Sequence, residues 1–211
     1  MIKSNIKIVF LGESSIGKTS IVHRLIRDVF NDNPESTIGA SFMTYEKDNI
    51  RYNVWDTAGQ ERYMSLSQMY YRNSDIILLV FDVSNIETIN KLLLFLDKLV
   101  IDLKKDNKII IIGNKTDLVT DVERLAVDNI LTNLLKKDKY NDILNQIEYL
   151  YVSAKSGENC LELSEMIYKF GTDLVKAGKQ SQKNTIGVIN YNSILPSTSI
   201  INPNNNGKCS C

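Results

Sequence analysis

The sequence predicts an α/β fold in which a mostly parallel sheet carries helices on both faces. Short apolar runs alternate along the chain with segments whose apolar residues recur at helical spacing. Two runs, 76–83 and 108–112, are dominated by Ile, Leu and Val, which is typical of strands buried on both faces. A glycine loop joins the first run to the first helix. Folds of this kind bind ligands at the carboxyl ends of their strands.

The elements follow in a regular order. Residues 6–11 predict a strand, 12–17 a loop, and the next residues a helix that ends near Arg27. Residues 41–47 and 51–55 flank Asp48-Asn49 and predict a hairpin. We expect the remaining elements to be strand 76–83, helix 86–103, strand 108–112, helix 118–135, strand 149–152 and helix 160–175.

Composition predicts one domain, residues 1–177, and a flexible tail, residues 178–211. Apolar residues make up 43% of the 211, which is enough for a core. The tail is rich in Asn, Ser, Lys and Gly and has no periodicity. The net charge is zero, with 25 basic and 25 acidic residues, which argues against nucleic-acid binding. Three cysteines, two of them in the last three positions, indicate a reducing, cytosolic setting and no disulfide framework.

Residues 12–19, GESSIGKT, match the phosphate-loop pattern G-x-x-x-x-G-K-[ST]. Such a loop turns successive backbone N–H groups toward phosphate oxygens, and the following helix adds its positive N-terminal end. The Lys18 charge would then meet the β- and γ-phosphates, and the Thr19 hydroxyl would ligate Mg²⁺. We predict a nucleotide contact from each of Ser14, Ser15, Ile16, Gly17, Lys18, Thr19 and Ser20.

The residues Asn114-Lys115-Thr116-Asp117 close the 108–112 strand and select the base. A carboxylate only accepts hydrogen bonds, so Asp117 suits guanine N1–H and N2–H and opposes the bare N1 lone pair of adenine. This argues against an ATP-dependent P-loop kinase, the main rival enzyme class. The Lys115 stem would lie along the base plane, and Asn114 would tie the loops together. After the last strand, the backbone N–H groups of Ser153, Ala154 and Lys155 would face guanine O6.

A third motif, residues 55–61 (WDTAGQE), follows the second hairpin strand. Asp56 is placed to hold a Mg²⁺-bound water, the Gly59 N–H to meet the γ-phosphate, and Gln60 to orient the attacking water. Hydrolysis of GTP is therefore the predicted reaction.

Together these motifs resemble the Ras superfamily, and within it the Rab family, over about residues 5–175 and again at the last three residues. Residues 35–42 look like the Rab first switch, and residues 61–66 and 69–72 look like the second switch. The sequences of these segments most resemble the early-endosomal Rab subgroup. The resemblance implies a P-loop NTPase with a Ras-like mixed sheet, acting as a GTP/GDP switch in vesicle traffic. It makes Thr37 the second Mg²⁺ hydroxyl, catalytic together with Lys18 and Gln60, and sets Phe30 against the guanine.

The resemblance also implies partners. Phe42, Trp55 and Tyr70 match the family's effector-facing aromatic triad, although the residues alone would place Phe42 and Trp55 in the core. The expected partners are an exchange factor, a GTPase-activating protein, effectors, a prenylation escort and a GDP-dissociation inhibitor. The protein itself is expected to be a monomer. Cys209 and Cys211 resemble a double-geranylgeranylation signal, which implies the cytoplasmic face of endosomal membranes and cycling through the cytosol.

Two departures leave alternatives open. Ser14 stands where many Ras-like proteins have glycine, near the γ-phosphate, so a nucleotide-bound adaptor with little turnover remains an alternative to an active GTPase. The stretch 118–152 is longer than in typical Rabs, and we expect its charge run, residues 136–139, to be a solvated helix face.

Overall fold

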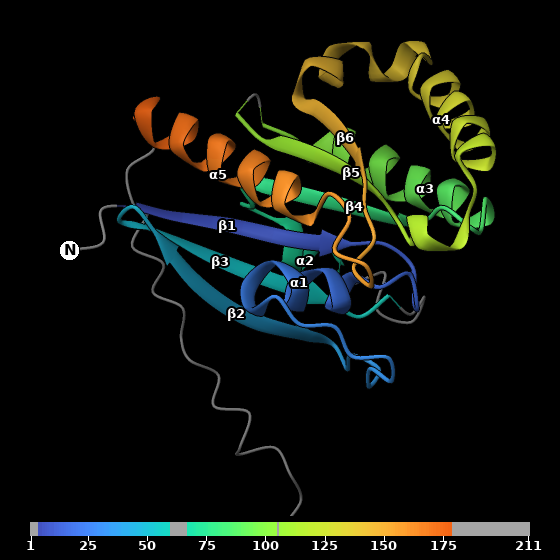
Figure 1. Cartoon of the computed structure of the whole chain (residues 1–211). Helices are drawn as coiled ribbons and strands as arrows, with labels where there is room; N and C mark the ends of the chain where they lie inside the picture. Colours follow the sequence, from blue (N-terminus) through green and yellow to red (C-terminus); the bar gives the residue numbers. More distant parts are fainter. Residues whose placement is uncertain (1–3, 60–66, 105, 179–211) are drawn as a thin grey trace, which may run out of the picture. The chain divides into compact units, whose positions relative to one another are not determined.

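The computed structural model describes residues 4–59, 67–104 and 106–178. Its centre is a six-stranded sheet in the order β2-β3-β1-β4-β5-β6 (Figure 1). Neighbouring strands run parallel except for the antiparallel β2–β3 pair, which confirms the predicted mixed sheet. The strands are β1 (Ser4–Leu11), β2 (Ala40–Lys47), β3 (Ile50–Thr57), β4 (Ile76–Asp82), β5 (Lys108–Asn114) and β6 (Ile147–Tyr151).

The predicted hairpin forms at the predicted turn. Asp48 and Asn49 both have positive φ, 49° and 65°, as a two-residue turn between twisted antiparallel strands requires. The hairpin register places Phe42 opposite Trp55. This pairing matters for the surface described below.

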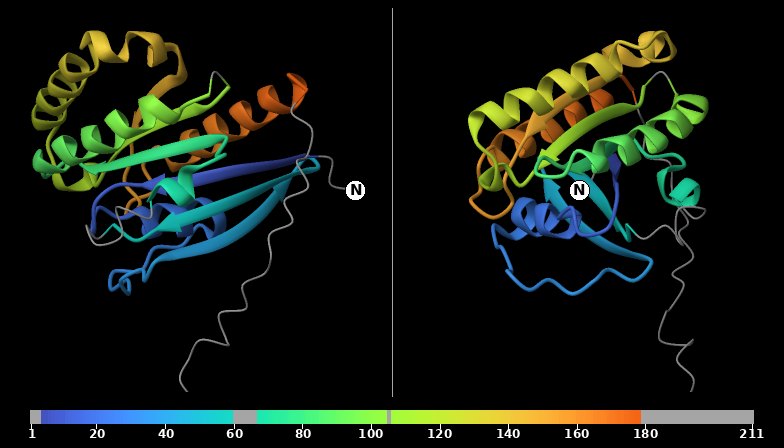
Figure 2. Two further views of the ribbon diagram at one scale, coloured as in Figure 1. Left: turned by 180° about the vertical axis from the view of Figure 1, so that it is seen from behind. Right: turned by 90° about the vertical axis from the view of Figure 1, so that its right-hand side faces the viewer.

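Helices cover both faces of the sheet (Figure 2). One face of the sheet packs on α1 and α5, and the other on α3, α4 and the 3₁₀ segment η3. The helical segments are α1 (Lys18–Arg27), α2 (Ser67–Tyr71), α3 (Glu87–Asp102), η2 (Thr116–Leu118), α4 (Asp121–Leu135), η3 (Asp138–Gln146) and α5 (Cys160–Lys176).

Side-chain alternation along β1 explains the two layers of core. Ile6, Ile8 and Phe10 enter the core under α1 and α5, whereas Val9 and Leu11 enter the core under α3 and α4. Every residue of β4, at the middle of the sheet, is buried. These central strands therefore hold their carboxyl ends in fixed positions.

The region between β5 and β6 differs from the sequence prediction. The single helix expected over 118–135 is a 3₁₀ turn followed by α4, because Thr120 ends the turn and caps α4 in a capping box with Glu123. The charge run is solvated as expected, since residues 136–139 are all exposed, but it spans the junction of α4 and η3 and is not the face of one helix. Lys139 pairs with Asp97 of α3, and the buried Tyr140 donates to the same carboxylate at 2.6 Å. Within the described residues, no helix is long and apolar enough to cross a membrane.

Candidate functional site

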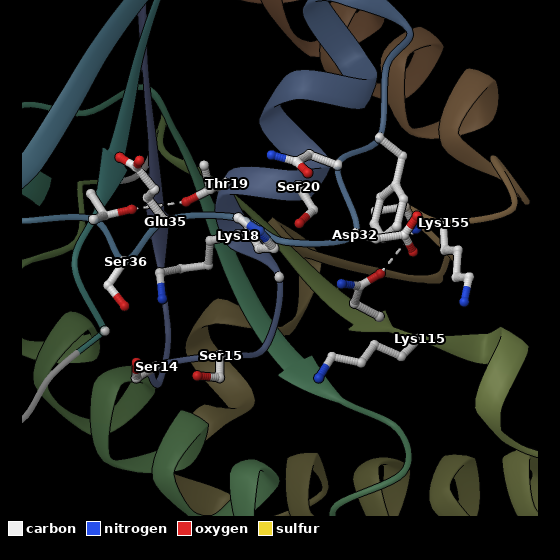
Figure 3. A pocket seen from close by; sticks show the side chains of 18 of the residues that line it. Ser14, Ser15, Lys18, Thr19, Ser20, Asp32, Glu35, Ser36, Lys115 and Lys155 are labelled. Atoms are coloured by element: carbon white, nitrogen blue, oxygen red, sulfur yellow. Dashed lines mark hydrogen bonds between the residues drawn. The ribbon is translucent and has the colours of Figure 1, made fainter.

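A cavity of about 380 Å³ opens where β1, β3 and β5 end, between the loops that follow them (Figure 3). Most predicted nucleotide-binding residues line it: Ser14, Ser15, Gly17, Lys18, Thr19, Ser20, Phe30, Thr37, Gly59, Asn114, Lys115, Asp117, Ala154 and Lys155. Ile16 and Ser153 do not, because their side chains are buried behind it. In Figure 3 the loop with Ser14 and Ser15 lies toward one end of the cavity, and Lys155 toward the other.

The loop between β1 and α1 is built to hold an anion. Gly17 caps α1 with φ 89°, no side chain caps the helix, and its first turn holds no acidic residue. The N-terminal N–H groups of α1 thus remain available to a ligand. Lys18 is buried and donates to the carbonyls of Gly12 at 3.0 Å and Glu13 at 2.5 Å. Burial lowers the pKa of Lys18 to about 8.

Three oxygen-bearing side chains meet beside this loop. Thr19 Oγ1 donates to Asp56 Oδ2 at 2.7 Å and lies 2.9 Å from Thr37 Oγ1. Burial raises the pKa of Asp56, and the hydrogen bond from Thr19 opposes that rise. Asp56 Oδ1 is buried and has no hydrogen-bond partner among the described residues. An orphaned carboxylate oxygen beside two hydroxyls is a donor set that suits a hard divalent cation.

Asn114 joins three loops at the other end of the cavity. Its Nδ2 donates to Ile16 O at 2.8 Å, and its Oδ1 accepts from Ala154 N at 3.2 Å. A Cβ on Gly17 would lie 2.4 Å from Asn114 Nδ2, so glycine permits this close approach. The phosphate loop and the two base-side loops are thereby held as one unit.

Asp117 is oriented by Ser153. The Ser153 hydroxyl donates to Asp117 Oδ1 at 2.6 Å and accepts from Ser156 N at 3.0 Å. Sequence reasoning expected the Ser153 backbone N–H to face the base. That N–H donates to Glu158 O at 3.1 Å, and the Ser153 side chain lies on the carboxylate. Asp117 itself lines the cavity with a fixed carboxylate.

The segment after β3 lies directly on the phosphate loop. A Cβ on Gly59 would come within 2.2 Å of the Glu13 carbonyl and 2.3 Å of Ser14 N, so only glycine fits there. Gln60 and the second-switch residues 61–66 lie outside the described residues, as do Cys209 and Cys211. Their predicted roles stay predictions.

Sequence reasoning missed two supporting residues. Arg24 of α1 donates from Nε to Ala154 O at 3.0 Å and from a terminal nitrogen to Lys155 O at 3.1 Å. Asp82, at the end of β4, pairs with Lys115 at 2.6 Å. Neither belongs to a recognisable motif; only the topology brings them against residues that line the cavity.

The three aromatic residues of the predicted effector triad lie together. The ring centroids of Phe42 and Trp55 are 5.0 Å apart, and those of Trp55 and Tyr70 are 6.1 Å apart. Phe42 is 46% exposed, so placing it in the core from the residues alone is wrong. Cross-strand pairing in the hairpin turns Phe42 and Trp55 to the same face.

Comparison with known proteins agrees with this geometry. A family model described as the Ras family matches residues 7–171. The chain is 34% identical to GTP-binding protein YPT53 of Saccharomyces cerevisiae, covering 98% of this chain and 94% of the relative. It is 35% identical to GTP-binding protein YPT52 of the same yeast, covering 91% and 95%. Identity to GTP-binding protein ypt5 of Schizosaccharomyces pombe is 38%, covering 78% and 77%. The chain therefore belongs to the Ras family and is a Rab-type small GTPase, which binds GTP and hydrolyses it.

Proposed function

We propose that this GTPase holds its nucleotide with Mg²⁺ and acts as a switch on endosomal membranes, where loss of the γ-phosphate releases the segments that carry Thr37 and Gly59. The observation that carries the proposal is the meeting of Thr19 and Thr37 at Asp56, whose second oxygen is buried without a partner among the described residues. Thr19 belongs to the phosphate loop and Thr37 to the first switch. A cation between them would make the position of the switch depend on the nucleotide.

Thr19, Thr37 and Asp56 carry the oxygen atoms that a Mg²⁺ site requires. The Thr19 and Thr37 hydroxyls would bind it directly, and Asp56 would hold it through a water. Held there, a Mg²⁺ ion would supply positive charge against the phosphates of the nucleotide. Burial raises the pKa of Asp56 even though Thr19 and the Lys18 charge oppose that rise, which supports a site that gains from a further positive charge.

The rest of the cavity supports guanine nucleotide in one orientation. Lys18 and the N-terminus of α1 supply positive charge at one end. Asp117 supplies acceptors at the other end, near Phe30 and the 153–155 loop. The charged groups thus match phosphates at one end and the N1–H and N2–H donors of guanine at the other.

Hydrolysis needs a water in line with the β–γ bond. We assign its orientation to Gln60, because the preceding Gly59 lies on the loop that holds the γ-phosphate. Motif reading finds no arginine placed to stabilise the reaction from within the chain, so slow intrinsic turnover and help from a GTPase-activating protein are expected. Ser14 lines the cavity and is the one feature favouring the adaptor alternative.

Membrane attachment and partners complete the proposal. Prenyl groups on Cys209 and Cys211 would hold the protein on the cytoplasmic face of endosomal membranes. Effectors would read the exposed Phe42 and its neighbours Trp55 and Tyr70. An exchange factor, an escort and a GDP-dissociation inhibitor would complete the cycle of a monomer.

Single-turnover hydrolysis tests the proposal. The purified protein is loaded with GTP, and phosphate release and nucleotide dissociation are followed with Mg²⁺ and with a chelator. We expect the chelator to accelerate dissociation.

Gln60→Leu should keep GTP bound and slow hydrolysis by about a hundredfold, because leucine fills the space and cannot orient water. Chelator-insensitive dissociation would remove the metal from the proposal. Unchanged hydrolysis in the variant would remove Gln60, and a wild type without turnover would favour the adaptor.

A further inference from the structure

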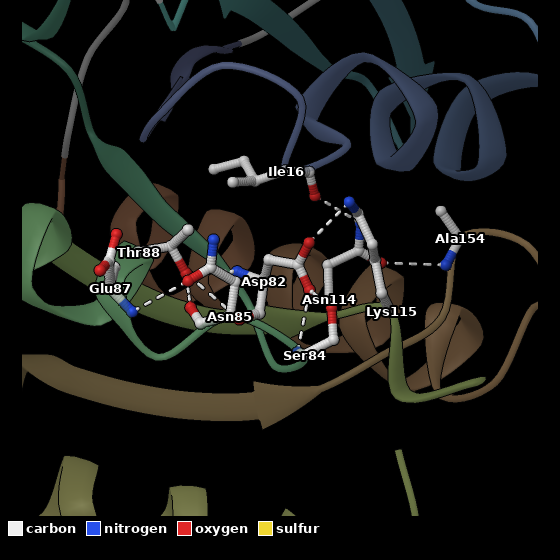
Figure 4. A network of polar contacts seen from close by, with 9 residues as sticks. All are labelled: Ile16, Asp82, Ser84, Asn85, Glu87, Thr88, Asn114, Lys115 and Ala154. Atoms are coloured by element: carbon white, nitrogen blue, oxygen red, sulfur yellow. Dashed lines mark hydrogen bonds and ion pairs between the residues drawn. The ribbon is translucent and has the colours of Figure 1, made fainter. Parts of the chain in front are cut away.

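Asp82 is a buried carboxylate that the phosphate and base motifs do not include. It is the last residue of β4 and lies opposite Asn114 in the register of β4 and β5. Its relative exposure is 8%. Figure 4 shows Asp82 between Ser84 on one side and Lys115 on the other.

The orientation of Asp82 is set by its own strand end. Its Oδ1 accepts from Ser84 N at 2.9 Å and from Ser84 Oγ at 2.6 Å. Its backbone N–H donates to Thr88 Oγ1 at 3.0 Å, and Thr88 donates onward to Asn85 O at 2.6 Å. One carboxylate oxygen is thus fixed, and the other, Oδ2, is left to meet a cation from a different loop.

That cation is Lys115. Its Nζ lies 2.6 Å from Asp82 Oδ2, and its side chain is 30% exposed along the wall of the cavity. Lys115 has φ 71°, a left-handed conformation that is strained for a residue with a side chain. Surrounding contacts must therefore hold it there. Its neighbour Asn114 is already committed at both ends to Ile16 and Ala154.

We propose that Asp82 is a positioning residue for guanine-nucleotide binding, holding Lys115 so that the lysine stem lies flat against the base. The inference rests on the proposed contact between Lys115 and the base. Asp82 touches neither phosphate loop nor metal ligand in the described contacts, so it acts through Lys115 alone. Its effect should be the same for GDP and GTP, because the two share the base and ribose.

The test measures dissociation of fluorescently labelled GDP and GTP from the full chain. Asp82→Asn keeps the size of the side chain and an oxygen for Ser84, and removes the charge that holds Lys115. We expect both nucleotides to leave about tenfold faster, by equal factors, because the lost charge no longer holds Lys115. Ser84→Ala, which frees Asp82 without removing its charge, should accelerate release by a smaller factor. Should Asp82→Asn fail to fold, this second variant carries the test.

Asp97→Asn is the matched control. Asp97 also joins a lysine, Lys139, and a hydroxyl, that of Tyr140, but it does not line the cavity. We expect this control to leave both dissociation rates at the wild-type value. Equal acceleration by Asp97→Asn and Asp82→Asn would overturn the proposal, since a general loosening of the fold would then explain both.

A double-mutant cycle with Lys115→Met completes the test. Methionine keeps an apolar stem and loses the charge, so Asp82→Asn should add little further acceleration in that background. Independent, multiplying effects would overturn the proposal. Rapid release from Lys115→Met with normal release from Asp82→Asn would overturn the role of Asp82 alone. Normal release from Lys115→Met would instead show that the proposed base contact of Lys115 is wrong.

Discussion

In the proposed site, base selection would depend on the orientation of one carboxylate, that of Asp117. The Ser153 hydroxyl holds Asp117 Oδ1 at 2.6 Å, and the Ser156 N–H holds that hydroxyl in turn. A carboxylate that cannot turn presents its acceptors in one direction. Two acceptors in one direction match two adjacent donors on a ligand, which guanine offers and adenine does not.

Asp117→Asn should therefore change base preference and leave the fold intact. Asparagine offers one acceptor and one donor, so its N–H would meet the guanine N2 amino group head-on. Xanthine carries a carbonyl there and becomes the better match. GTP affinity should fall by about a hundredfold or more while that of xanthosine triphosphate rises. Competition binding of the two nucleotides is the measurement. A variant that binds GTP tightly and ignores xanthosine triphosphate would show that Asp117 does not contact the base.

Residue spacing predicts part of this site and misses another part for a physical reason. Gly17, Lys18 and Asp117 sit in local motifs whose spacing follows from one loop binding one chemical group. Asp82 and Arg24 contact Lys115 and Ala154, which line the cavity, from a different strand and helix. Their contacts depend on how β4 pairs with β5 and how α1 packs, and a single sequence carries no local signal for either.

The contact between α5 and β3 depends on a glycine, which has no side chain. Gly171 of α5 faces the ring of Tyr52, and a Cβ there would lie 2.5 Å from the Tyr52 hydroxyl oxygen. Tyr52 is fully buried and stacks on Tyr45 with centroids 4.7 Å apart. Its hydroxyl has no hydrogen-bond partner among the described residues. The glycine thus lets α5 lie close to the hairpin strand.

Gly171→Ala should destabilise the domain by about 1–3 kcal/mol, because the added methyl must displace α5 or the Tyr52 ring. Tyr52→Phe should be neutral or slightly stabilising, since it removes an unsatisfied buried hydroxyl. The double variant should then lose less stability than Gly171→Ala alone, because the closest clash is with the atom removed. Urea unfolding at one fixed GDP concentration measures all three. Strictly additive changes would contradict the close contact.

The elements themselves were predictable where periodicity or turn chemistry was strong. The 76–83 and 108–112 runs, the Asp48-Asn49 turn and the helix after Gly17 all appear where the sequence places them. The stretch after Leu118 was read as one helix because its apolar spacing continues through Thr120. The capping box at Thr120 and Glu123 starts a new helix there, and the following segment η3 holds Tyr140, which is buried against α3. The structure of this stretch therefore depends on tertiary packing, which the spacing of its apolar residues does not reveal.

Across the molecule, the nucleotide cavity and the aromatic surface are joined by the hairpin. Thr37 precedes β2 and Gly59 follows β3, so both ends of the hairpin meet the phosphate side of the cavity. Phe42 and Trp55 face each other within the same two strands. Loss of the γ-phosphate at one end would therefore change the segments flanking the surface that partners are proposed to read.

The proposed membrane attachment of the whole protein depends on lipid anchors rather than on charge. The tail, residues 178–211, has only three lysines, so attraction to anionic lipid contributes little. A single lipid chain is a marginal anchor even at about 0.8 kcal/mol for each buried CH₂, and stable attachment takes two. In the proposed anchor, Cys209 and Cys211 would supply the two attachment points.

Replacing both Cys209 and Cys211 with serine should therefore give a protein that leaves the membrane fraction and keeps its GTP turnover. Either single replacement should leave loose or misplaced binding, since one lipid remains. Fractionation of the three variants in a cell with geranylgeranyl transferase, alongside a turnover assay of each, makes the measurement. A double variant that still pellets with membranes would exclude the two-lipid anchor without affecting the GTPase assignment, because the described residues that line the nucleotide cavity lie between Ser14 and Lys155.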